Sequence, residues 1–174
     1  MSDGFKIKSD KVIENFKKAL DLSKNIKPLM LKILGDEESN LPWTMRGSVI
    51  KSFKDQVSPG TGGLAWAPLS PKYAAKKAKK YPGMPTLVAS GKLFNSLARK
   101  GEGSVGPAFK DTTMVWGTSI YYAQYHQSIA NRTTLPRRAF LNITKEQKKA
   151  WNILLAQYIK DTMTGVDPEK KALS

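Results

Sequence analysis

The segment from Ser119 to Leu141 places the strongest constraint on how this chain can fold. A cluster of small and aromatic residues at its start ends with His126, the only histidine of the chain, and a polar loop follows at residues 131–134. The loop has no apolar anchor and leads to Pro136, which biases Leu135 toward an extended backbone because the proline ring disfavours a helical residue before it. One segment thus combines aromatic packing with a rigid corner.

Two arginines, Arg137 and Arg138, follow the proline and precede Phe140 and Leu141, for which the sequence predicts a buried strand or turn. We expect both arginines near the surface. Their planar guanidinium groups could bind phosphate or bridge to a carboxylate of a neighbouring subunit. Alternatively, one of them ties the preceding loop to the C-terminal helix. We prefer the interpretation that they lie at a subunit interface.

Hydrophobic spacing and end signals predict a mainly helical chain with one short sheet. Helices are expected at residues 9–34, 44–56, from Ser70 and Pro71 onward, 91–99, 120–129 and 144–163. Strands are expected at residues 105–109 and 113–116, joined by a hairpin turn at Lys110 and Asp111.

Capping residues set the expected ends of these helices. Ser70 and Ser90 should each cap a helix start with a side-chain hydroxyl. Thr144 and Gln147 should form a capping box at the start of the last helix, and Gly165 should stop it. An apolar stripe runs along this last helix, at Trp151, Leu154, Leu155, Tyr158, Ile159 and Met163.

These elements predict an α+β fold in which a small antiparallel β-sheet packs with an N-terminal helical region and a long C-terminal helix. At 174 residues the chain is long enough for one domain with a real core. Residues 1–40 are expected to form an N-terminal helical arm, residues 41–165 the α+β domain and residues 166–174 a disordered polar tail. Trp66 follows a glycine-rich breaker, and we expect it to pack on the core with its indole nitrogen hydrogen-bonded.

The charge of the chain limits the partners to consider. The 29 lysines and arginines outnumber the 14 acidic residues and give a net charge of +15. Such a surplus attracts polyanions over a Debye length of about 8–10 Å in physiological salt, so nucleic acid is the first partner to consider. A basic surface that only confers solubility is the alternative.

Basic residues are densest in the helix that starts at Ser70, and no acidic residue occurs between Asp55 and Glu102. The candidate phosphate-contacting residues are Lys72, Lys76, Lys77, Lys79 and Lys80. All but Lys77 follow the i, i+4, i+7, i+8 spacing that puts side chains on one helix face. Like charges at that spacing cost roughly a few tenths of a kcal/mol each in a free helix, so we expect this face to meet phosphates or an acidic partner. A solvated lysine face is the alternative.

The sequence carries no pattern of an active site. Without cysteine it excludes disulfides, thiolate zinc sites and cysteine nucleophiles, and its single histidine excludes a histidine-rich metal site. No carboxylate close to His126 in sequence could orient it as a base, and the acidic residues lack the spacing of metal ligands that a nuclease would need. We therefore expect a non-enzyme with no catalytic residue, metal or cofactor.

Membrane segments are not expected either. The N-terminus has no apolar signal region, and no run approaches the ~18 apolar residues of a membrane span. We expect the protein to be made and used in a cytoplasm-like compartment, or assembled there into something larger.

Four motifs occur in an order that resembles one family. In chain order they are a glycine-rich turn with W.PLS at residues 60–70, L..SG.L..S at residues 87–96, V.G....YA at residues 115–123, and YA..HQ, a loop and P.R.FL at residues 122–141. Together they are similar to the phage virion-morphogenesis (tail-completion) family, including its Mu-like members, over roughly residues 40–160. The signature residues are Trp66, Gly91, Leu93, Gly117, Tyr122, Ala123, His126, Gln127, Pro136 and Phe140.

The resemblance implies a tail-completion or head–tail connector protein in the virion neck, assembled in the host cytoplasm. It implies a homo-oligomeric ring around the DNA channel, in contact with other neck and tail proteins (a head adaptor, a tail terminator or tube). A ring would turn identical lysine faces toward packaged double-stranded DNA. The lysines would contact phosphates without recognising the base sequence.

A stand-alone basic nucleic-acid-binding protein, such as a host nucleoid or RNA-binding factor, is the alternative from another class. Such a protein should bind free duplex or single strands as a monomer or dimer, with a steep dependence on salt. A connector should bind free DNA weakly and gain affinity in the ring. An enzyme ranks third.

Overall fold

The computed structural model describes residues 14, 17–18, 26–37, 41–129 and 135–164. Within these residues it contains six helices and one two-stranded antiparallel sheet, which confirms the predicted α+β class. In chain order the elements are α2 (Lys27–Leu34), α3 (Met45–Asp55), α4 (Pro71–Lys80), α5 (Lys92–Ala98), β1 (Ser104–Lys110), β2 (Thr113–Thr118), α6 (Ala123–Gln127) and α7 (Lys145–Met163).

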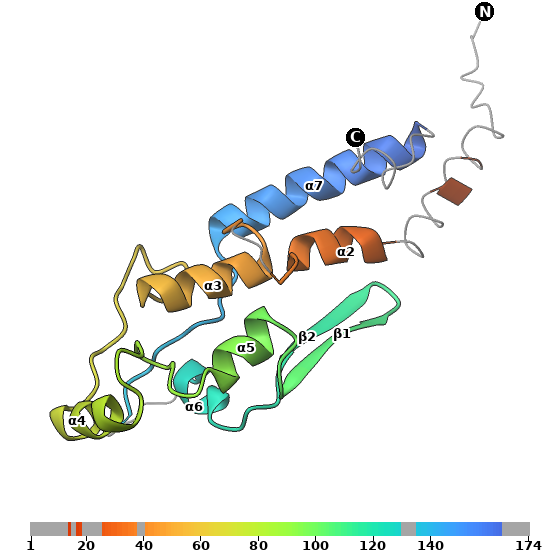
Figure 1. Cartoon of the computed structure of the whole chain (residues 1–174). Helices are drawn as coiled ribbons and strands as arrows, with labels where there is room; N and C mark the ends of the chain where they lie inside the picture. Colours follow the sequence, from red (N-terminus) through yellow and green to blue (C-terminus); the bar gives the residue numbers. More distant parts are fainter. Residues whose placement is uncertain (1–13, 15–16, 19–25, 38–40, 130–134, 165–174) are drawn as a thin grey trace, which may run out of the picture.

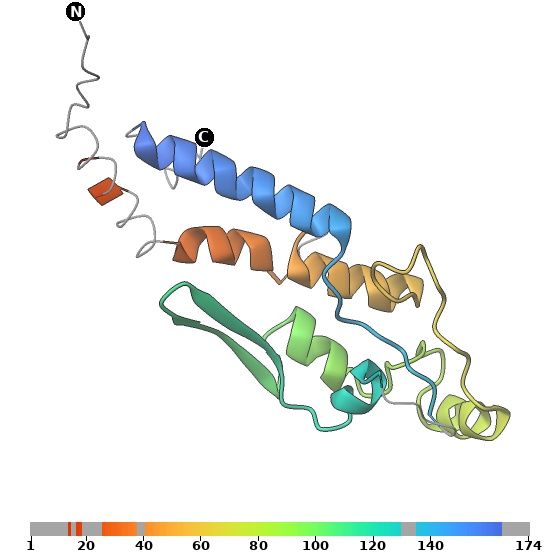
Figure 2. The ribbon, with the colours of Figure 1, turned by 180° about the vertical axis from the view of Figure 1, so that it is seen from behind.

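The elements form an elongated body with α4 at one end (Figure 1). The long helix α7 runs beside α2, and α3 continues from α2 toward the middle of the molecule, as the view from behind also shows (Figure 2). Helix α5 and the hairpin lie on the other side of α2 and α3. Of the predicted first helix, Glu14, Lys17 and Lys18 are helical, and most of its remaining residues before α2 lie outside the described residues, as do the predicted stop at Gly165 and the tail.

The core forms where α3 crosses α5. Helix α3 begins after Thr44, close to its predicted start. The Thr44 hydroxyl accepts a hydrogen bond from the amide of Gly47, and the helix buries Val49 and Phe53 one turn apart. Phe53 packs edge-on against Trp66, with ring centroids 5.3 Å apart. Leu93, Leu97, Ala123 and Phe140 complete the buried cluster.

The hairpin differs from its prediction at the turn. Lys110 pairs with Thr113, so the loop residues are Asp111 and Thr112, one position later than expected. Asp111 adopts a left-handed backbone with φ 51°, a region that aspartate tolerates better than most residues. Both strands extend slightly beyond the predicted limits, while α6 is shorter than predicted.

Two predicted helix caps are wrong in their chemistry. Ser70 occupies the N-cap position of α4, but its hydroxyl makes no capping hydrogen bond. At α5 the N-cap is Gly91 rather than Ser90, with φ 79°, a conformation that glycine adopts without steric cost. The capping box of Thr144 and Gln147 is confirmed: each side chain bonds the backbone amide of the other residue.

Helix α7 buries few of its apolar residues. Its buried positions are the polar Gln147 and Asp161, whereas Ile153, Leu155 and Ile159 are exposed. Trp151 is half-buried and its indole Nε1 donates to the carbonyl of Trp43 at 2.7 Å. The apolar stripe predicted for this helix is therefore covered only in part by α2. No helix among the described residues is long and apolar enough to cross a bilayer.

Candidate functional site

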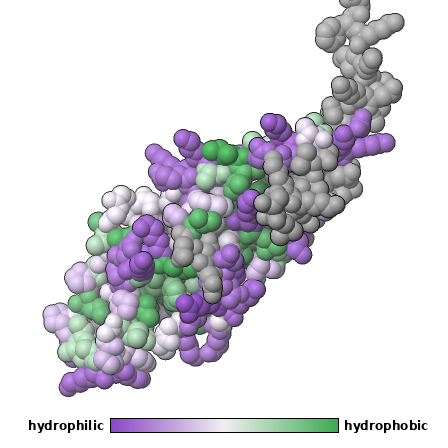
Figure 3. All heavy atoms as spheres, turned by 45° about the horizontal axis from the view of Figure 1, so that its top comes forward, coloured by the Kyte–Doolittle hydropathy of each residue, from purple (hydrophilic) through white to green (hydrophobic). Residues whose placement is uncertain are grey.

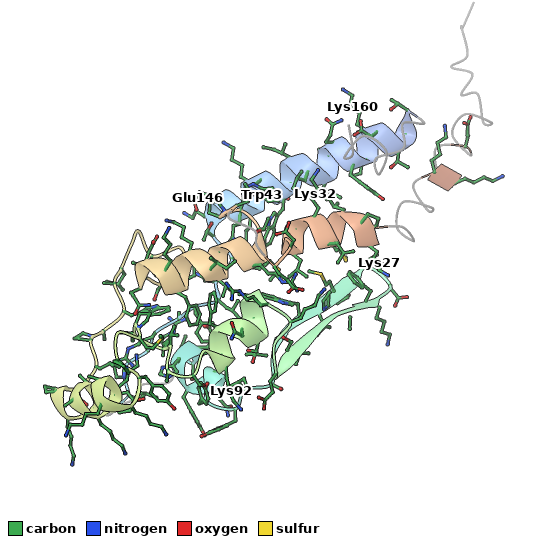
Figure 4. All side chains as sticks on the ribbon, in the orientation of Figure 1. Lys27, Lys32, Trp43, Lys92, Glu146 and Lys160 are labelled. Carbon is green, nitrogen blue, oxygen red and sulfur yellow. The ribbon has the colours of Figure 1, made fainter. Side chains whose placement is uncertain are left out.

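Helix α4 presents the lysine face predicted from the sequence. Four of its lysines, Lys72, Lys76, Lys79 and Lys80, are exposed, and the helix contains no acidic residue. None of the ion pairs found in the described part of the chain involves them. Side chains that end in nitrogen extend from α4 away from the body in Figure 4, and hydrophilic residues edge this end in Figure 3. The face could therefore approach a polyanion without first breaking an ion pair.

Lys77 does not belong to this face. Its side chain is only 7% exposed, and its Nζ donates to the carbonyl of Met84 at 2.8 Å and to the carbonyl of Pro85. Burial lowers the pKa of Lys77 below its ordinary value. The amine thus holds the loop after α4 against the helix, and only the four lysines that share the helical spacing face outward.

Arg138 is buried, contrary to the expectation that both arginines stay near the surface. Its side chain is 3% exposed; Nε donates to the carbonyl of Ala67 and Nη2 to the carbonyl of Pro68, each at 2.8 Å. Desolvation lowers the pKa of Arg138, and nearby Tyr73 opposes that shift. Arg138 therefore ties the segment before α4 to the segment before α7.

Arg137 remains a surface residue. It is exposed, and its Nε donates to the carbonyl of Gln127 at 3.2 Å. Of the two arginines predicted for a subunit interface, Arg137 is the one whose guanidinium can reach another chain.

Signature residues from distant motifs meet in the core. The indole Nε1 of Trp66 donates to the carbonyl of Ala139 at 2.9 Å, as predicted for a core anchor. The side-chain amide of Gln127 accepts from the backbone amides of Phe140 and Leu141, both at 3.2 Å, and donates to the carbonyl of Leu141. Through these bonds the Gln127 side chain pairs with the backbone of residues 140–141 and holds α6 against the segment that precedes α7.

The other signature residues occupy turns, the core and a cavity wall. Gly91 caps α5, Leu93 is buried beneath it, and Gly117 pairs with Val105 in the hairpin. Ala123 is buried at the start of α6. Tyr122, His126 and Pro136 line a cavity between α4 and α6.

That cavity has a volume of about 950 Å³. Four tyrosines and the two buried cations line it: Tyr73, Tyr81, Tyr121, Tyr122, Lys77 and Arg138. Burial raises the pKa of the Tyr122 hydroxyl above its ordinary value. At the rim, Lys92 pairs with Glu102 at 2.9 Å, and this hydrogen bond raises the pKa of Lys92.

Sequence reasoning did not predict the cavity. Its walls come from four separate stretches, residues 68–81, 87–92, 121–126 and 135–138, and their proximity is a property of the fold. Two tyrosines were a usable signal, because Tyr73 within α4 and Tyr81 at its C-cap bring aromatic rings next to the lysines.

A second surface of note is the uncharged belt of α7, residues 151–159. These nine consecutive residues carry no charge, although the chain as a whole has a net charge of +15. Ile153 is 60% exposed in this belt. Exposed apolar area of this kind commonly marks a contact surface.

The described residues contain no group of three or more His, Asp or Glu side chains arranged to hold a metal ion. His126 lies in α6, and its backbone carbonyl accepts a hydrogen bond from the amide of Arg138 at 3.1 Å. This bond connects α6 to the segment that leads to α7.

Comparison with known proteins identifies one family. A family model described as the phage virion morphogenesis family matches residues 8–160. The match includes α4, the cavity, the signature residues and most of α7. No curated protein and no solved structure matches the chain.

Proposed function

The chain belongs to the phage virion morphogenesis family, and from this premise we propose that it is a tail-completion or head–tail connector protein in the neck of a tailed phage. Membership makes it a protein of phage particle assembly. The neck position, where a ring of copies would surround the DNA channel and join tail to head, is the finer statement proposed here. In this role the chain carries out no reaction and needs no metal or cofactor.

The exposed lysine face of α4 is the observation that carries the proposed DNA contact. Lys72, Lys76, Lys79 and Lys80 lie at one end of an elongated body, with no acidic side chain on the same helix. A cyclic assembly would repeat this face around its axis, and like-charged faces around a lumen focus the field on whatever passes through it. Contacts to the phosphate backbone alone suit DNA of any sequence.

The uncharged belt of α7 supports self-assembly. Two copies that each carry +15 repel one another at distances within the Debye length, so a stable contact needs a surface where charge is absent and apolar area is available. Residues 151–159 meet both conditions, with Ile153, Leu155 and Ile159 exposed. We take a second copy as the partner of this belt, and Arg137 as an additional interface residue.

The proposed partners are further neck and tail proteins above and below the ring, together with packaged double-stranded DNA. The proposed location is the virion neck, with assembly in the host cytoplasm. A reconstruction of the neck from images of purified virions that carry an epitope-tagged copy tests this location. Tag density in a ring between head and tail, with α4 toward the axis, is the expected result; purified virions without the tagged chain would rule the location out.

A stand-alone nucleic-acid-binding protein is the second candidate, because one copy of the chain already presents the complete lysine face without assembly. Titration of a short DNA duplex with the purified chain at several salt concentrations separates the two. Tight binding by a monomer or dimer with a steep salt slope would favour the second candidate. Weak binding that strengthens on assembly would favour the connector.

A further inference from the structure

The cavity between α4 and α6 combines buried positive charge with aromatic walls. Lys77 and Arg138 both contribute to its lining. Neither forms an ion pair with any acidic residue that the structure describes. Among those same residues, no Asp or Glu lines the cavity.

The two cations are bonded to carbonyl oxygens alone. Arg138 uses Nε and Nη2 for the carbonyls of Ala67 and Pro68, which leaves Nη1 without a protein acceptor among the described residues. Lys77 bonds the carbonyls of Met84 and Pro85. A buried cation that meets only neutral dipoles has lost its hydration without gaining an opposite charge, so an incoming carboxylate would be favoured there.

Exposed tyrosines line the mouth of this cavity. Tyr121 is 74% exposed and packs edge-on against Tyr122, with ring centroids 5.4 Å apart. Tyr73, on the α4 side, is 51% exposed. Tyrosine and arginine are the residue types that most often concentrate binding energy in protein–protein interfaces, because their side chains combine large contact area with directed polar groups.

The size of the cavity favours a peptide over a nucleic acid. A volume of about 950 Å³ suits a few side chains, and a duplex is too wide to enter it and reach the buried Arg138. Phosphates of a duplex would meet the outward lysines of α4 first. Those lysines would also steer an acidic segment toward the entrance, since complementary charge mainly accelerates encounter.

We propose that this cavity binds an acidic segment of a different protein, with a carboxylate at Arg138 and Lys77 and a neighbouring apolar side chain between the tyrosines. A second copy of this strongly basic chain is a poor source of such a segment. The site stands whether or not the chain occupies the neck, because it depends on the fold of one copy.

Selection from a random heptapeptide library displayed against the purified full chain tests this site. The expected result is enrichment of sequences with Asp or Glu beside an aromatic or aliphatic residue. The best synthetic peptide should bind at least about tenfold more tightly than its counterpart with Asn and Gln in place of the acids, as charge-assisted bonds to a buried arginine require.

Substitutions at the entrance locate the peptide without disturbing the core. Tyr121→Ala and Tyr73→Ala should each weaken binding about fivefold or more, because both rings would contact the peptide. Tyr125→Ala is the matched control, a tyrosine of α6 that does not line the cavity, and it should leave binding unchanged. Arg138→Lys should weaken binding while keeping the charge, provided its thermal unfolding shows a folded protein.

Three outcomes would overturn the site. Failure of the library to yield any enriched acidic sequence is the first. Equal binding by the acidic peptide and its amide counterpart is the second. Displacement of the peptide by inorganic phosphate and not by acetate is the third, since it would reassign the cavity to a phosphate group. Each result is obtained with the isolated chain, so it leaves the proposed neck location to its own test.

Discussion

The indole Nε1 of Trp66 donates to the carbonyl oxygen of Ala139 at 2.9 Å, across 73 residues of sequence. The bond joins the segment before α4 to the segment before α7, and Arg138 bonds the carbonyls of Ala67 and Pro68 beside it. Three bonds between the same two segments place the lysine helix relative to the core. The orientation of the lysine face therefore depends on Trp66 and Arg138, neither of which belongs to that face.

Replacement of Trp66 by Phe should destabilise the protein by about 1–3 kcal/mol, because it leaves the buried carbonyl of Ala139 without its donor and reduces packing. Urea unfolding measures the change in the free energy of unfolding. Tyr121→Phe, which removes a polar group from a mostly exposed side chain, should change that free energy by no more than about 0.5 kcal/mol. Equal stability of the Trp66 variant and the native chain would show that the bond does not hold the two segments together.

Gly47 in α3 should not tolerate even alanine. A Cβ at this position would lie 2.1 Å from the backbone carbonyl oxygen of Leu41, and that backbone cannot move without the cap at Thr44. Gly47→Ala should therefore cost about 1–3 kcal/mol despite the higher helix propensity of alanine. Gly117→Ala is the control, because nothing lies within 4 Å of its added Cβ. Thermal unfolding of both variants makes the comparison, and a Gly47 variant as stable as the Gly117 variant would contradict the described geometry.

The lysine face should matter for DNA and not for folding. Changing Lys72, Lys76, Lys79 and Lys80 together to Gln keeps good helix formers in place and removes four positive charges. In assembled protein, the slope of log affinity for duplex DNA against log salt should fall by about 1 per lysine that contacts phosphate. DNA retention by virions and particle yield should fall with it.

A variant with the same loss of charge controls for net charge. It carries Gln at four exposed lysines of α7: Lys145, Lys148, Lys149 and Lys160. If both variants lost affinity equally, the effect would be one of total charge, and the α4 face would have no special role. Unchanged DNA retention and particle yield in the α4 variant would contradict the proposal that these lysines line the DNA channel.

The belt of α7 should control self-association. Ile153→Lys places a charge in the uncharged belt at an exposed position, so it should weaken assembly while leaving the stability of the single chain unchanged within about 0.5 kcal/mol. Sedimentation at several protein concentrations measures the assembly. Ile129→Lys is the matched control, at an isoleucine that is 86% exposed and outside the belt. Equal assembly of the Ile153 variant and the control would exclude the belt as the interface between copies.

Local signals were enough to predict much of the fold. The capping box at Thr144 and the periodic burial of Val49 and Phe53 depend on residues within one or two turns, so local spacing was enough to locate α3 and the start of α7. The four outward lysines of α4 are also fixed by helical geometry. Trp66 was predicted as a core anchor because a buried indole needs both apolar contact and an acceptor.

Tertiary contacts decided the features that sequence did not predict. In the sequence Arg138 looks like a surface residue beside Arg137. Hydrogen bonds to the carbonyls of Ala67 and Pro68, some 70 residues away, offset the loss of hydration when its guanidinium is buried. Lys77 is removed from the lysine set by carbonyls of the following loop. The tyrosine cavity needs four segments in place before it exists. Hydroxyl caps were predicted at Ser70 and Ser90 from residue type alone. Residue type does not determine the side-chain rotamer or the exact residue at which a helix begins, so both predictions failed.

Electron microscopy of a lysate produced by phage that lacks this chain tests the neck role most directly. If the chain completes tails or connects them to heads, the lysate should contain DNA-filled heads lying apart from finished tails, and supplying the native chain should restore joined particles. Joined particles of normal shape in its absence would contradict the neck role.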